Sequence, residues 1–347
     1  MTSSTSSSDL GSPRYLAPTK FDVGLWLPPG ADEGGCAWWK DRTAIVIMLF
    51  LLLATMIAFF RTDVGYAEAP KWYWIDKLTW SDDASVIVAG DSRVYRGVDP
   101  DPIQSAIGGV VKNFGFSGTF VSHAYLRHSE ALLDPNGPRI LIIGVTRASL
   151  RVPHKSGDGF SQARAEFDRL KLPVPLARFI AEFDQFIHPV ALDLSAETTG
   201  ARASAAEYSQ TYYESGWIAS NREVVDPVAN GLVITQKNYD DSPHSDVAVS
   251  ALFDEVRELC QGGVKVFMFL PPVPPEVRAL EDSLAKISRA ELRCACESSG
   301  AQWVDVPFDG LRTYDGSHLD GPSARLVGEI LARAVADALR APPPSRP

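Results

Sequence analysis

The chain has 347 residues, of which 45% are hydrophobic and 22% charged, and its net charge is −10. This length suits one large domain or two small ones. The acidic balance argues against a nucleic-acid partner, which requires a basic face. The sequence contains no internal repeat and no glycine pattern of the phosphate-loop or dinucleotide-binding kind. Composition therefore predicts a globular protein with an additional apolar segment.

The N-terminal region, residues 1–42, is predicted to be a disordered tail. Ser, Thr, Pro and Gly are frequent in residues 1–35, which show little periodicity. Cys36 lies shortly before the apolar segment, where its thiol could carry a lipid or remain unmodified. A second disordered stretch is predicted at residues 342–347.

Residues 43–60 contain no charged side chain and are numerous enough for one membrane span. A buried core helix is the alternative, but core helices that are apolar on every face are uncommon. A cleaved signal peptide fits less well, because 42 residues precede the run. Lys40 and Arg42 flank one end and Arg61 the other, which favours an N-terminus on the cytoplasmic side of the membrane. The sequence thus predicts a single-pass membrane protein whose large domain is extracytoplasmic, in a periplasm or at a cell surface.

The next segment, residues 61–84, is rich in aromatic side chains. It contains Trp72, Tyr73, Trp74 and Trp80. We expect a short connector that lies along the membrane surface or along the flank of the following domain.

Apolar runs alternate with helical patterns from residue 85 onward. The apolar runs lie at 85–89, 110–114, 139–145, 264–270 and 302–306. The helical patterns lie at 119–133, 247–260, 276–299 and 321–340. Strands that alternate with helices form βαβ units and a mostly parallel sheet with right-handed crossovers. The expected fold class is therefore α/β, with about five parallel strands.

Residues 151–245 fit this alternation poorly and are interpreted as an insertion between the third and fourth strands. A helix is predicted at 161–186, followed by aromatic and turn residues. Tyr212, Tyr213 and Trp217 could stack on sugar rings, although loop aromatics more often pack locally. Inserted material above a sheet often shapes a substrate site, so Trp217 is a candidate substrate-binding residue.

Ser92 follows the first predicted strand after Gly90 and Asp91. Chemistry in an open α/β sheet collects beyond the carboxyl ends of its strands. A serine there can begin the next helix, where free backbone N–H groups favour developing negative charge. Gly-Asp-Ser is also an ordinary turn sequence, so this tripeptide needs support from elsewhere in the chain.

Asp315 and His318 supply that support, because they lie between the last predicted strand and the last predicted helix. Residues three apart can share one side of a turn. In nucleophilic catalysis a histidine takes the proton of a serine, and a carboxylate holds the other ring nitrogen. The alternative is a helix-capping Asp315 beside a surface histidine. Since both stretches follow strands of one parallel sheet, we expect Ser92, His318 and Asp315 to meet at its edge as a catalytic triad.

These stretches resemble the sequence blocks of the SGNH (GDSL) hydrolase superfamily of serine esterases and acyltransferases. Gly90-Asp91-Ser92 resembles the first block, residues 113–119 the second, and Asp315–His318 the last. The resemblance covers residues 85–341 outside the insertion. It implies a flavodoxin-like three-layer sandwich, preceded here by one transmembrane helix, and no metal or organic cofactor.

The resemblance also implies individual roles. Ser92 would be the nucleophile, His318 the base and Asp315 the residue that orients it. The backbone N–H groups of Ser92 and Gly118 would form the oxyanion hole. The family usually has Gly-x-Asn-Asp after the third strand, but Thr146 occupies the asparagine position here.

A threonine in place of the usual asparagine has three interpretations. Its hydroxyl could donate to the oxyanion over a shorter reach, a different donor such as Arg147 could replace it, or activity could be lost. Arg93, beside the nucleophile, could bind an anionic substrate or pair with Asp91 or Asp99. Arg93 and Arg147 are therefore candidate substrate-binding residues.

The predicted anchor makes the chain similar to the membrane-bound branch of the superfamily that modifies cell-surface polymers. That similarity implies an esterase or O-acyltransferase, an acylated polysaccharide or other ester as substrate, and an envelope acyl-transfer complex as partner. A non-catalytic polysaccharide-binding or assembly subunit with the same fold is the main alternative. A protein that tethers partners through its long tail is a third.

Three cysteines lie late in the chain. A disulfide from Cys260 to Cys294 or Cys296 would be compatible with an extracytoplasmic domain. Cys-Ala-Cys has the wrong spacing for a zinc half-site, so no metal is expected there.

Overall fold

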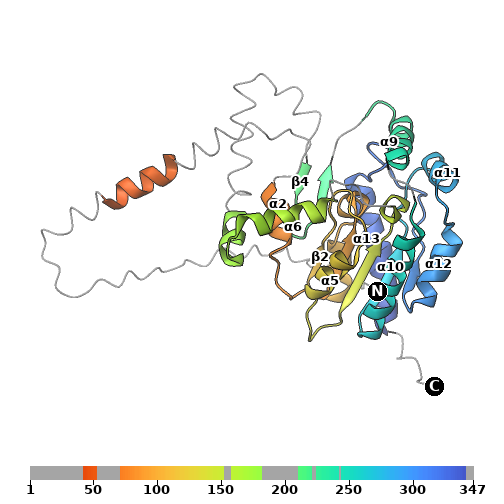
Figure 1. The fold of residues 1–347 in the computed structure, drawn as a ribbon, viewed down its shortest axis with the longest axis horizontal. Helices are drawn as coiled ribbons and strands as arrows, with labels where there is room; N and C mark the ends of the chain where they lie inside the picture. Colours follow the sequence, from red (N-terminus) through yellow and green to blue (C-terminus); the bar gives the residue numbers. More distant parts are fainter. Residues whose placement is uncertain are drawn as a thin grey trace, which may run out of the picture. The chain divides into compact units, whose positions relative to one another are not determined.

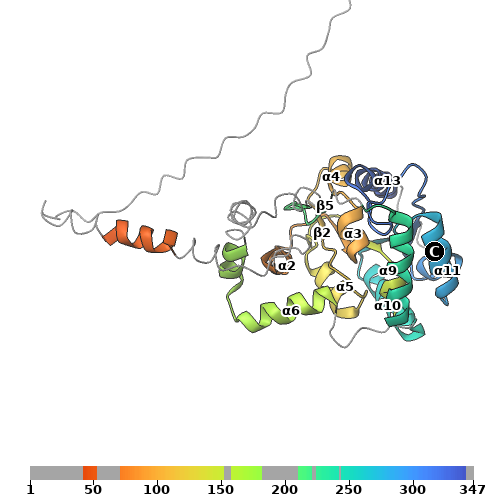
Figure 2. The ribbon, with the colours of Figure 1, turned by 90° about the horizontal axis from the view of Figure 1, so that it is seen from above.

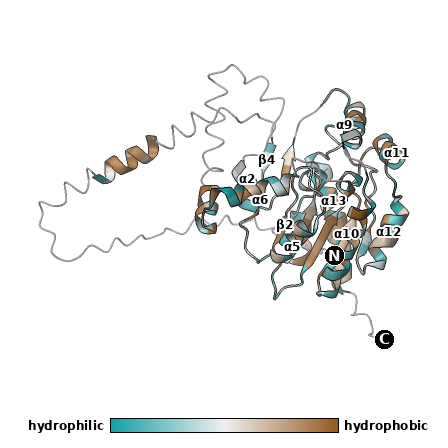
Figure 3. Cartoon of the chain, in the orientation of Figure 1, coloured by the Kyte–Doolittle hydropathy of each residue, from teal (hydrophilic) through white to brown (hydrophobic). Residues whose placement is uncertain are grey.

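The computed structural model describes residues 42–52, 71–151, 158–181, 210–220, 224–241 and 244–340. The predicted tails therefore lie almost entirely outside the described residues. The chain divides into two units, Met1–Ile57 and Ala58–Pro347. In the first unit residues 42–52 form a helix that is mostly hydrophobic (Figure 3). Every residue from Ile45 to Leu52 is exposed.

The described residues contain no helix that is both long and apolar enough to cross a membrane. The predicted span, residues 43–60, is described only as far as Leu52. A membrane anchor therefore stays a prediction.

The second unit is built on a five-stranded parallel sheet (Figure 1). The strands are β1 (Val86–Gly90), β2 (Val111–Asn113), β3 (Ile140–Gly144), β6 (Lys265–Phe269) and β7 (Gln302–Val304). Their order is β2-β1-β3-β6-β7, and every neighbouring pair is parallel. Each strand coincides with one of the five predicted apolar runs, which confirms the α/β class and the parallel sheet.

Helices cover both faces of the sheet, because side chains alternate between its faces along each strand. Val86 and Val88 contact one core, and Ile87 and Ala89 the other. The first core is covered by α3 (Ser92–Gly97), α4 (Asp101–Ile107) and α13 (Gly321–Arg340). The second is covered by α5 (His123–Ala131), α10 (Asp246–Gln261) and α12 (Arg289–Ser298). Figure 2 shows α4 and α13 on one side and α5 and α10 on the other, a three-layer arrangement.

The strand order reverses its winding direction at β1. The chain leaves β1 for β2 on one side and returns to β3 on the other. In doubly wound sheets a ligand site forms where the winding direction reverses, outside the carboxyl ends of the strands. Ser92 directly follows β1 and so lies at this point.

Two predicted helices are divided in the structure. The 276–299 pattern forms α11 (Pro275–Leu284) and α12, and Ser288 begins the second with a reciprocal capping box to Glu291. A capping box satisfies backbone N–H groups that would otherwise lack partners, so a new helix starts there. The 161–186 pattern becomes α6 (Gly159–Leu170) and a second helix at 174–181, with later residues outside the described range.

The segment between β3 and β6 contains elements that the sequence did not reveal. After α6 it forms an antiparallel hairpin of β4 (Gln210–Tyr212) and β5 (Ile218–Ser220). Helix α9 (Pro227–Asp241) follows and packs against α11. Figure 1 shows α9 beyond one end of the sheet.

Residues 71–84 pack on the domain. Helix α2 (Lys71–Lys77) buries Tyr73 and Ile75, and Ala84 forms a bridge with Leu133. Of the two positions expected for the connector, the described part occupies the flank of the domain.

The disulfide considered between Cys260 and Cys294 or Cys296 is not formed in the structure. Cys260, Cys294 and Cys296 are free thiols, and the last is buried against the core. Burial raises the pKa of Cys296 to about 12, so this thiol stays protonated at neutral pH.

Candidate active site

Ser92 is the first residue of α3, as expected, because Asp91 caps the helix. The Asp91 Oδ1 atom accepts a hydrogen bond from the Arg93 N–H at 3.0 Å. The Asp91 carbonyl accepts from the Val94 N–H at 2.9 Å. This cap fixes the direction in which Ser92 leaves the sheet.

A pair of glycines allows α3 to lie close to the sheet. Gly90 and Gly144 are opposite each other on β1 and β3. A Cβ atom on either residue would lie 2.3 Å from Val94 Cγ2. The glycines therefore give Val94 room to pack against the strand ends, which places the start of α3 directly over the edge.

Ser92, His318 and Asp315 meet in hydrogen-bonding geometry. The Ser92 Oγ atom lies 2.9 Å from His318 Nε2. His318 Nδ1 lies 2.7 Å from Asp315 Oδ2. The other carboxylate oxygen, Oδ1, accepts the backbone N–H groups of Ser317 and His318 at 2.9 and 2.8 Å. Three residues from the two ends of the domain thus form the nucleophile, base and orienter arrangement of acyl-transfer enzymes.

The two titrating members of this arrangement have shifted pKa values. Burial alone would raise the pKa of Asp315, but His318 and the two N–H bonds outweigh it and hold that pKa below its ordinary value. Burial lowers the pKa of His318, and Arg96 and Arg93 lower it further, while Asp315 opposes them. At neutral pH, His318 is therefore a neutral base beside an ionised carboxylate.

These shifts predict an acid limb in the pH profile. Only neutral His318 can accept a proton, so kcat/KM should fall as the pH drops through its pKa. Because that pKa lies below the ordinary 6.5, the midpoint should lie below pH 6.5, with a plateau through neutral pH. Hydrolysis of p-nitrophenyl acetate by the full chain measures this profile.

The matched variant is Arg96→Gln, which removes a positive charge that lowers the His318 pKa. Its midpoint should move toward higher pH. A wild-type midpoint above 6.5, or a shift of the variant in the opposite direction, would contradict the assignment of His318 as the base.

Two contacts hold residues 314–318, which we call the histidine loop, against α3. Arg93 Nε donates to Ser317 Oγ at 3.0 Å. The Tyr314 ring is stacked on the His318 ring, with centroids 5.9 Å apart, and its hydroxyl accepts from Arg96. Arg93 and Arg96 of α3, the helix that begins with Ser92, therefore both bind the histidine loop.

Helix α9 packs on the same loop from the insertion. Asn230 Nδ2 donates to the Asp315 carbonyl at 2.7 Å. A Cβ atom on Gly231 would lie 2.6 Å from the Gly316 carbonyl oxygen, so the two backbones are in direct contact. The insertion therefore supports the triad itself.

The predicted second block forms a loop beside the nucleophile, and we call residues 113–118 the oxyanion loop. The Phe116 N–H donates to the Gly90 carbonyl at 3.1 Å, two residues before Ser92. Gly118 follows two residues later, is exposed and has φ of +57°. No side chain blocks it, since a Cβ atom there would have nothing within 4 Å.

Thr146 does not have a free hydroxyl for an oxyanion, which corrects the expected role. Its side chain is 1% exposed and its Oγ1 donates to Asp91 Oδ2. The same oxygen accepts the Ser149 N–H at 3.1 Å, so its single proton is directed at Asp91. Thr146 caps the turn Arg147–Leu150 and ties it to the residue that caps α3.

Replacing Thr146 by Val should therefore affect stability more than turnover. The buried Asp91 carboxyl and the Ser149 N–H would each lose a partner, which should cost about 1–3 kcal/mol of unfolding free energy. We expect kcat to fall less than about tenfold, against the 10²–10³-fold typical of a lost oxyanion donor. Denaturant unfolding and ester hydrolysis separate the two effects.

Thr119→Val is the stability control, since the Thr119 hydroxyl is buried without a hydrogen-bond partner among the described residues. It should be neutral or stabilising. A loss of turnover above about 10²-fold in Thr146→Val, at unchanged stability, would restore the direct role.

The three candidate substrate-binding residues are all engaged in the protein interior. Arg93 is 9% exposed and pairs with Glu281 at 2.5 Å, in place of the expected Asp91 or Asp99. Arg147 is 2% exposed and pairs with Asp282 at 2.5 Å. Trp217 is 8% exposed, stacks on Tyr213 and donates to the Arg96 carbonyl at 3.1 Å. All three side chains are largely buried and paired with other parts of the protein, so the structure favours a role in supporting the site.

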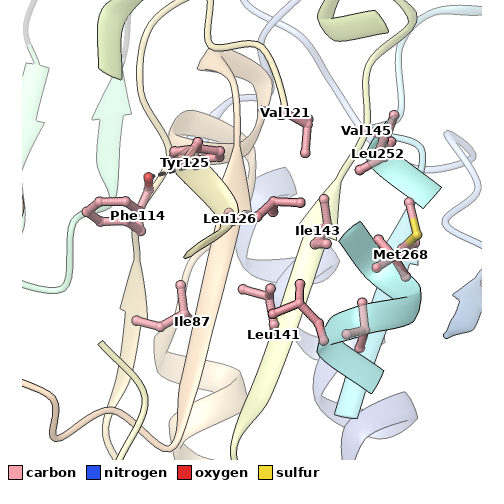
Figure 4. Close-up of a cluster of buried hydrophobic side chains, with 14 of the residues drawn as sticks. Ile87, Phe114, Val121, Tyr125, Leu126, Leu141, Ile143, Val145, Leu252 and Met268 are labelled. Carbon is pink, nitrogen blue, oxygen red and sulfur yellow. Dashed lines mark hydrogen bonds between the residues drawn. The ribbon is translucent and has the colours of Figure 1, made fainter. Parts of the chain in front are cut away.

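Sequence analysis also missed two buried groups that hold the strand ends. The Tyr125 hydroxyl accepts the Gly90 N–H at 2.7 Å and lies 2.9 Å from the Phe114 carbonyl (Figure 4). The Asn113 amide donates to the carbonyls of Val94 and Val98. Neither has a sequence signal, because each lies within an apolar or helical pattern and acts through distant backbone.

No metal site is formed by the part of the chain that the structure describes, since no three His, Cys, Asp or Glu side chains are grouped to hold one. Comparison with family models, with curated proteins and with solved structures gives no match to this chain.

Proposed function

We propose that the chain is an SGNH-type serine esterase or O-acyltransferase whose triad is Ser92, His318 and Asp315. The observation that carries the proposal is the continuous pair of hydrogen bonds, 2.9 Å from Ser92 to His318 and 2.7 Å from His318 to Asp315. Its position at the winding reversal of a parallel sheet supports it.

The reaction has two half-reactions. Ser92 Oγ attacks the ester carbonyl carbon while His318 Nε2 takes its proton. The bond to the leaving alkoxide breaks, and His318 returns the proton to that oxygen. Water or a sugar hydroxyl then attacks the acyl carbon and gives its proton to His318, which protonates the departing Ser92 Oγ. Asp315 keeps the His318 tautomer and stabilises its charged form throughout.

The oxyanion of each tetrahedral intermediate would be stabilised by the N–H groups of Ser92 and Gly118. The oxyanion loop lies beside β1 through the Phe116–Gly90 bond, which supports this pairing. With Thr146 bound to Asp91, the site would rely on backbone donors.

The proposed setting is a membrane surface, with an acylated envelope polysaccharide as substrate and an acyl-transfer complex as partner. The exposed apolar run Ile45–Leu52 supports an anchor, because eight consecutive exposed apolar side chains are costly in water. The substrate class follows only from the resemblance to membrane-bound SGNH proteins.

Covalent labelling tests the triad directly. A fluorophosphonate probe should modify wild-type protein at Ser92, with the site read by peptide mass spectrometry, and Ser92→Ala should remain unlabelled. Ser283→Ala, an exposed serine on α11, is the control and should label like wild type.

Labelling that persists in Ser92→Ala would overturn the assignment of Ser92 as the nucleophile. No labelling of folded wild type would overturn the enzyme proposal in favour of a non-catalytic binding subunit. For an active protein, product analysis with an acetyl donor and candidate glycans distinguishes transfer from hydrolysis.

A further inference from the structure

The last residue of α2, Lys77, carries a fully buried amine that the proposed reaction does not use. Its side chain is 0% exposed. Its Nζ donates to three backbone carbonyls, those of Asn113 and Gly115 at 2.9 Å and that of Gly216 at 2.8 Å. An ammonium group has three N–H donors and no acceptor, so each donor has one carbonyl.

Aromatic rings enclose the same ammonium. The Nζ atom lies 5.1–5.9 Å from the ring centroids of Tyr73, Trp74, Trp80, Tyr95 and Phe116. Burial lowers the pKa of Lys77, with Asp76 opposing the shift, while the carbonyls and ring faces favour the charged form. A buried cation costs free energy that an apolar side chain of similar size would not.

One of the three belongs to the peptide between Gly115 and Phe116. Its carbonyl accepts from Lys77, and its N–H donates to the Gly90 carbonyl at 3.1 Å. This single peptide plane therefore links Lys77 to the end of β1, the strand that precedes Ser92. It fixes the rotation of the oxyanion loop just before that loop reaches Gly118.

The other two carbonyls bring the hairpin turn to the same place. A Cβ atom on Gly216 would lie 2.0 Å from the Asn113 carbonyl oxygen, so turn and loop are in backbone contact. The Asn113 N–H donates to the Ser215 carbonyl at 2.6 Å. Lys77 thus joins three segments that are distant in sequence: α2, the oxyanion loop and the β4–β5 turn.

We propose that Lys77 is a positioning residue that holds the oxyanion loop against the end of β1, so that Gly118 lies beside Ser92 when charge develops on the substrate oxygen. This role rests on the proposed function. Lys77 itself contacts no reacting atom and acts through the Gly115–Phe116 peptide.

The test is Lys77→Met in the full chain, kept in detergent micelles. Methionine fills a similar volume but removes all three donors. We expect kcat for p-nitrophenyl acetate to fall roughly 30- to 100-fold, as for small displacements of catalytic groups, while KM changes less than about threefold. The second-order rate of Ser92 phosphonylation should fall by a similar factor, because the phosphoryl oxygen occupies the same hole.

Two variants keep the test decisive if Lys77→Met folds poorly. Gly115→Ala leaves Lys77 intact, but its Cβ would lie 2.9 Å from the Tyr95 backbone nitrogen and displace the loop. This variant should also have a lower kcat and a nearly unchanged KM. Lys77→Arg keeps a cation with several donors and should recover part of the lost rate.

Val335→Ala is the control for general destabilisation, since Val335 is buried in α13 and belongs to the opposite core. It should lower stability and leave kcat unchanged. A folded Lys77→Met with wild-type kcat and labelling rate overturns the role of Lys77 alone, as does activity that simply follows stability across all variants. A folded wild type that neither hydrolyses the ester nor labels at Ser92 overturns the proposed function itself.

Discussion

Replacing His318 by Ala should lower kcat for p-nitrophenyl acetate by about 10⁴-fold or more. The Ser92 hydroxyl would lose the imidazole that lies 2.9 Å away and takes its proton. Without that base the hydroxyl is a weak nucleophile at neutral pH. Steady-state hydrolysis by the full chain measures the loss.

Ser92→Ala and the double variant complete this experiment. Residues that act as one unit give non-additive losses, so the double variant should be within about tenfold of the worse single variant. His123→Ala is the matched control, because His123 is 72% exposed and pairs with Glu255 away from the triad. Multiplicative losses, or more than a tenth of wild-type activity in His318→Ala, would contradict the triad.

Replacing Gly90 by Ala should strongly destabilise the folded protein. Gly90 has φ of +154°, and an added Cβ would lie 2.7 Å from the Gly144 carbonyl oxygen on the neighbouring strand and 2.3 Å from Val94 Cγ2. Backbone strain and a clash with a central strand together should cost at least about 3 kcal/mol of unfolding free energy. That is a large share of the stability of an ordinary domain.

Gly263→Ala separates the contribution of backbone strain from that of the steric clash. Gly263 also has positive φ, +83°, but a Cβ there would have nothing within 4 Å. It should cost only about 1 kcal/mol, from conformational strain. Denaturant unfolding followed by tryptophan fluorescence compares them, and equal losses would show that the approach of α3 to the sheet does not require this glycine.

The strands could be predicted from the sequence because they are buried on both faces. β1 and β3 are buried at all five positions, so each appears as an uninterrupted apolar run. Short helices were harder to find. α3 has only six residues, too few for a clear 3.6-residue pattern, and its start is set by the Asp91 cap.

The elements of the insertion between β3 and β6 could not be predicted, for a different reason. α9 is fixed by its packing on α11 and on the histidine loop, and neither contact leaves a local pattern. The hairpin strands β4 and β5 have three residues each and are stabilised partly by the turn at Gly216, which contacts the oxyanion loop. Tertiary contacts decide such elements, so local propensity does not reveal them.

Some residues of the candidate site could be placed from the sequence and others could not. Ser92 and His318 could be paired in advance because strand ends of one parallel sheet share an edge. The destinations of Arg93, Arg147 and Thr146 could not. Each side chain is directed by a partner from another element, namely Glu281, Asp282 or Asp91.

The contact between α9 and the histidine loop limits how this chain could be recombined. Asn230 and Gly231 come from the segment between β3 and β6, yet they support the backbone of Asp315 and Gly316. Exchanging that segment as an independent cassette would remove this support from the acid and base of the triad. A chimera that remains active must therefore keep the contact between α9 and the histidine loop. Substrate specificity can then change only through residues of the exchanged segment that do not touch this loop.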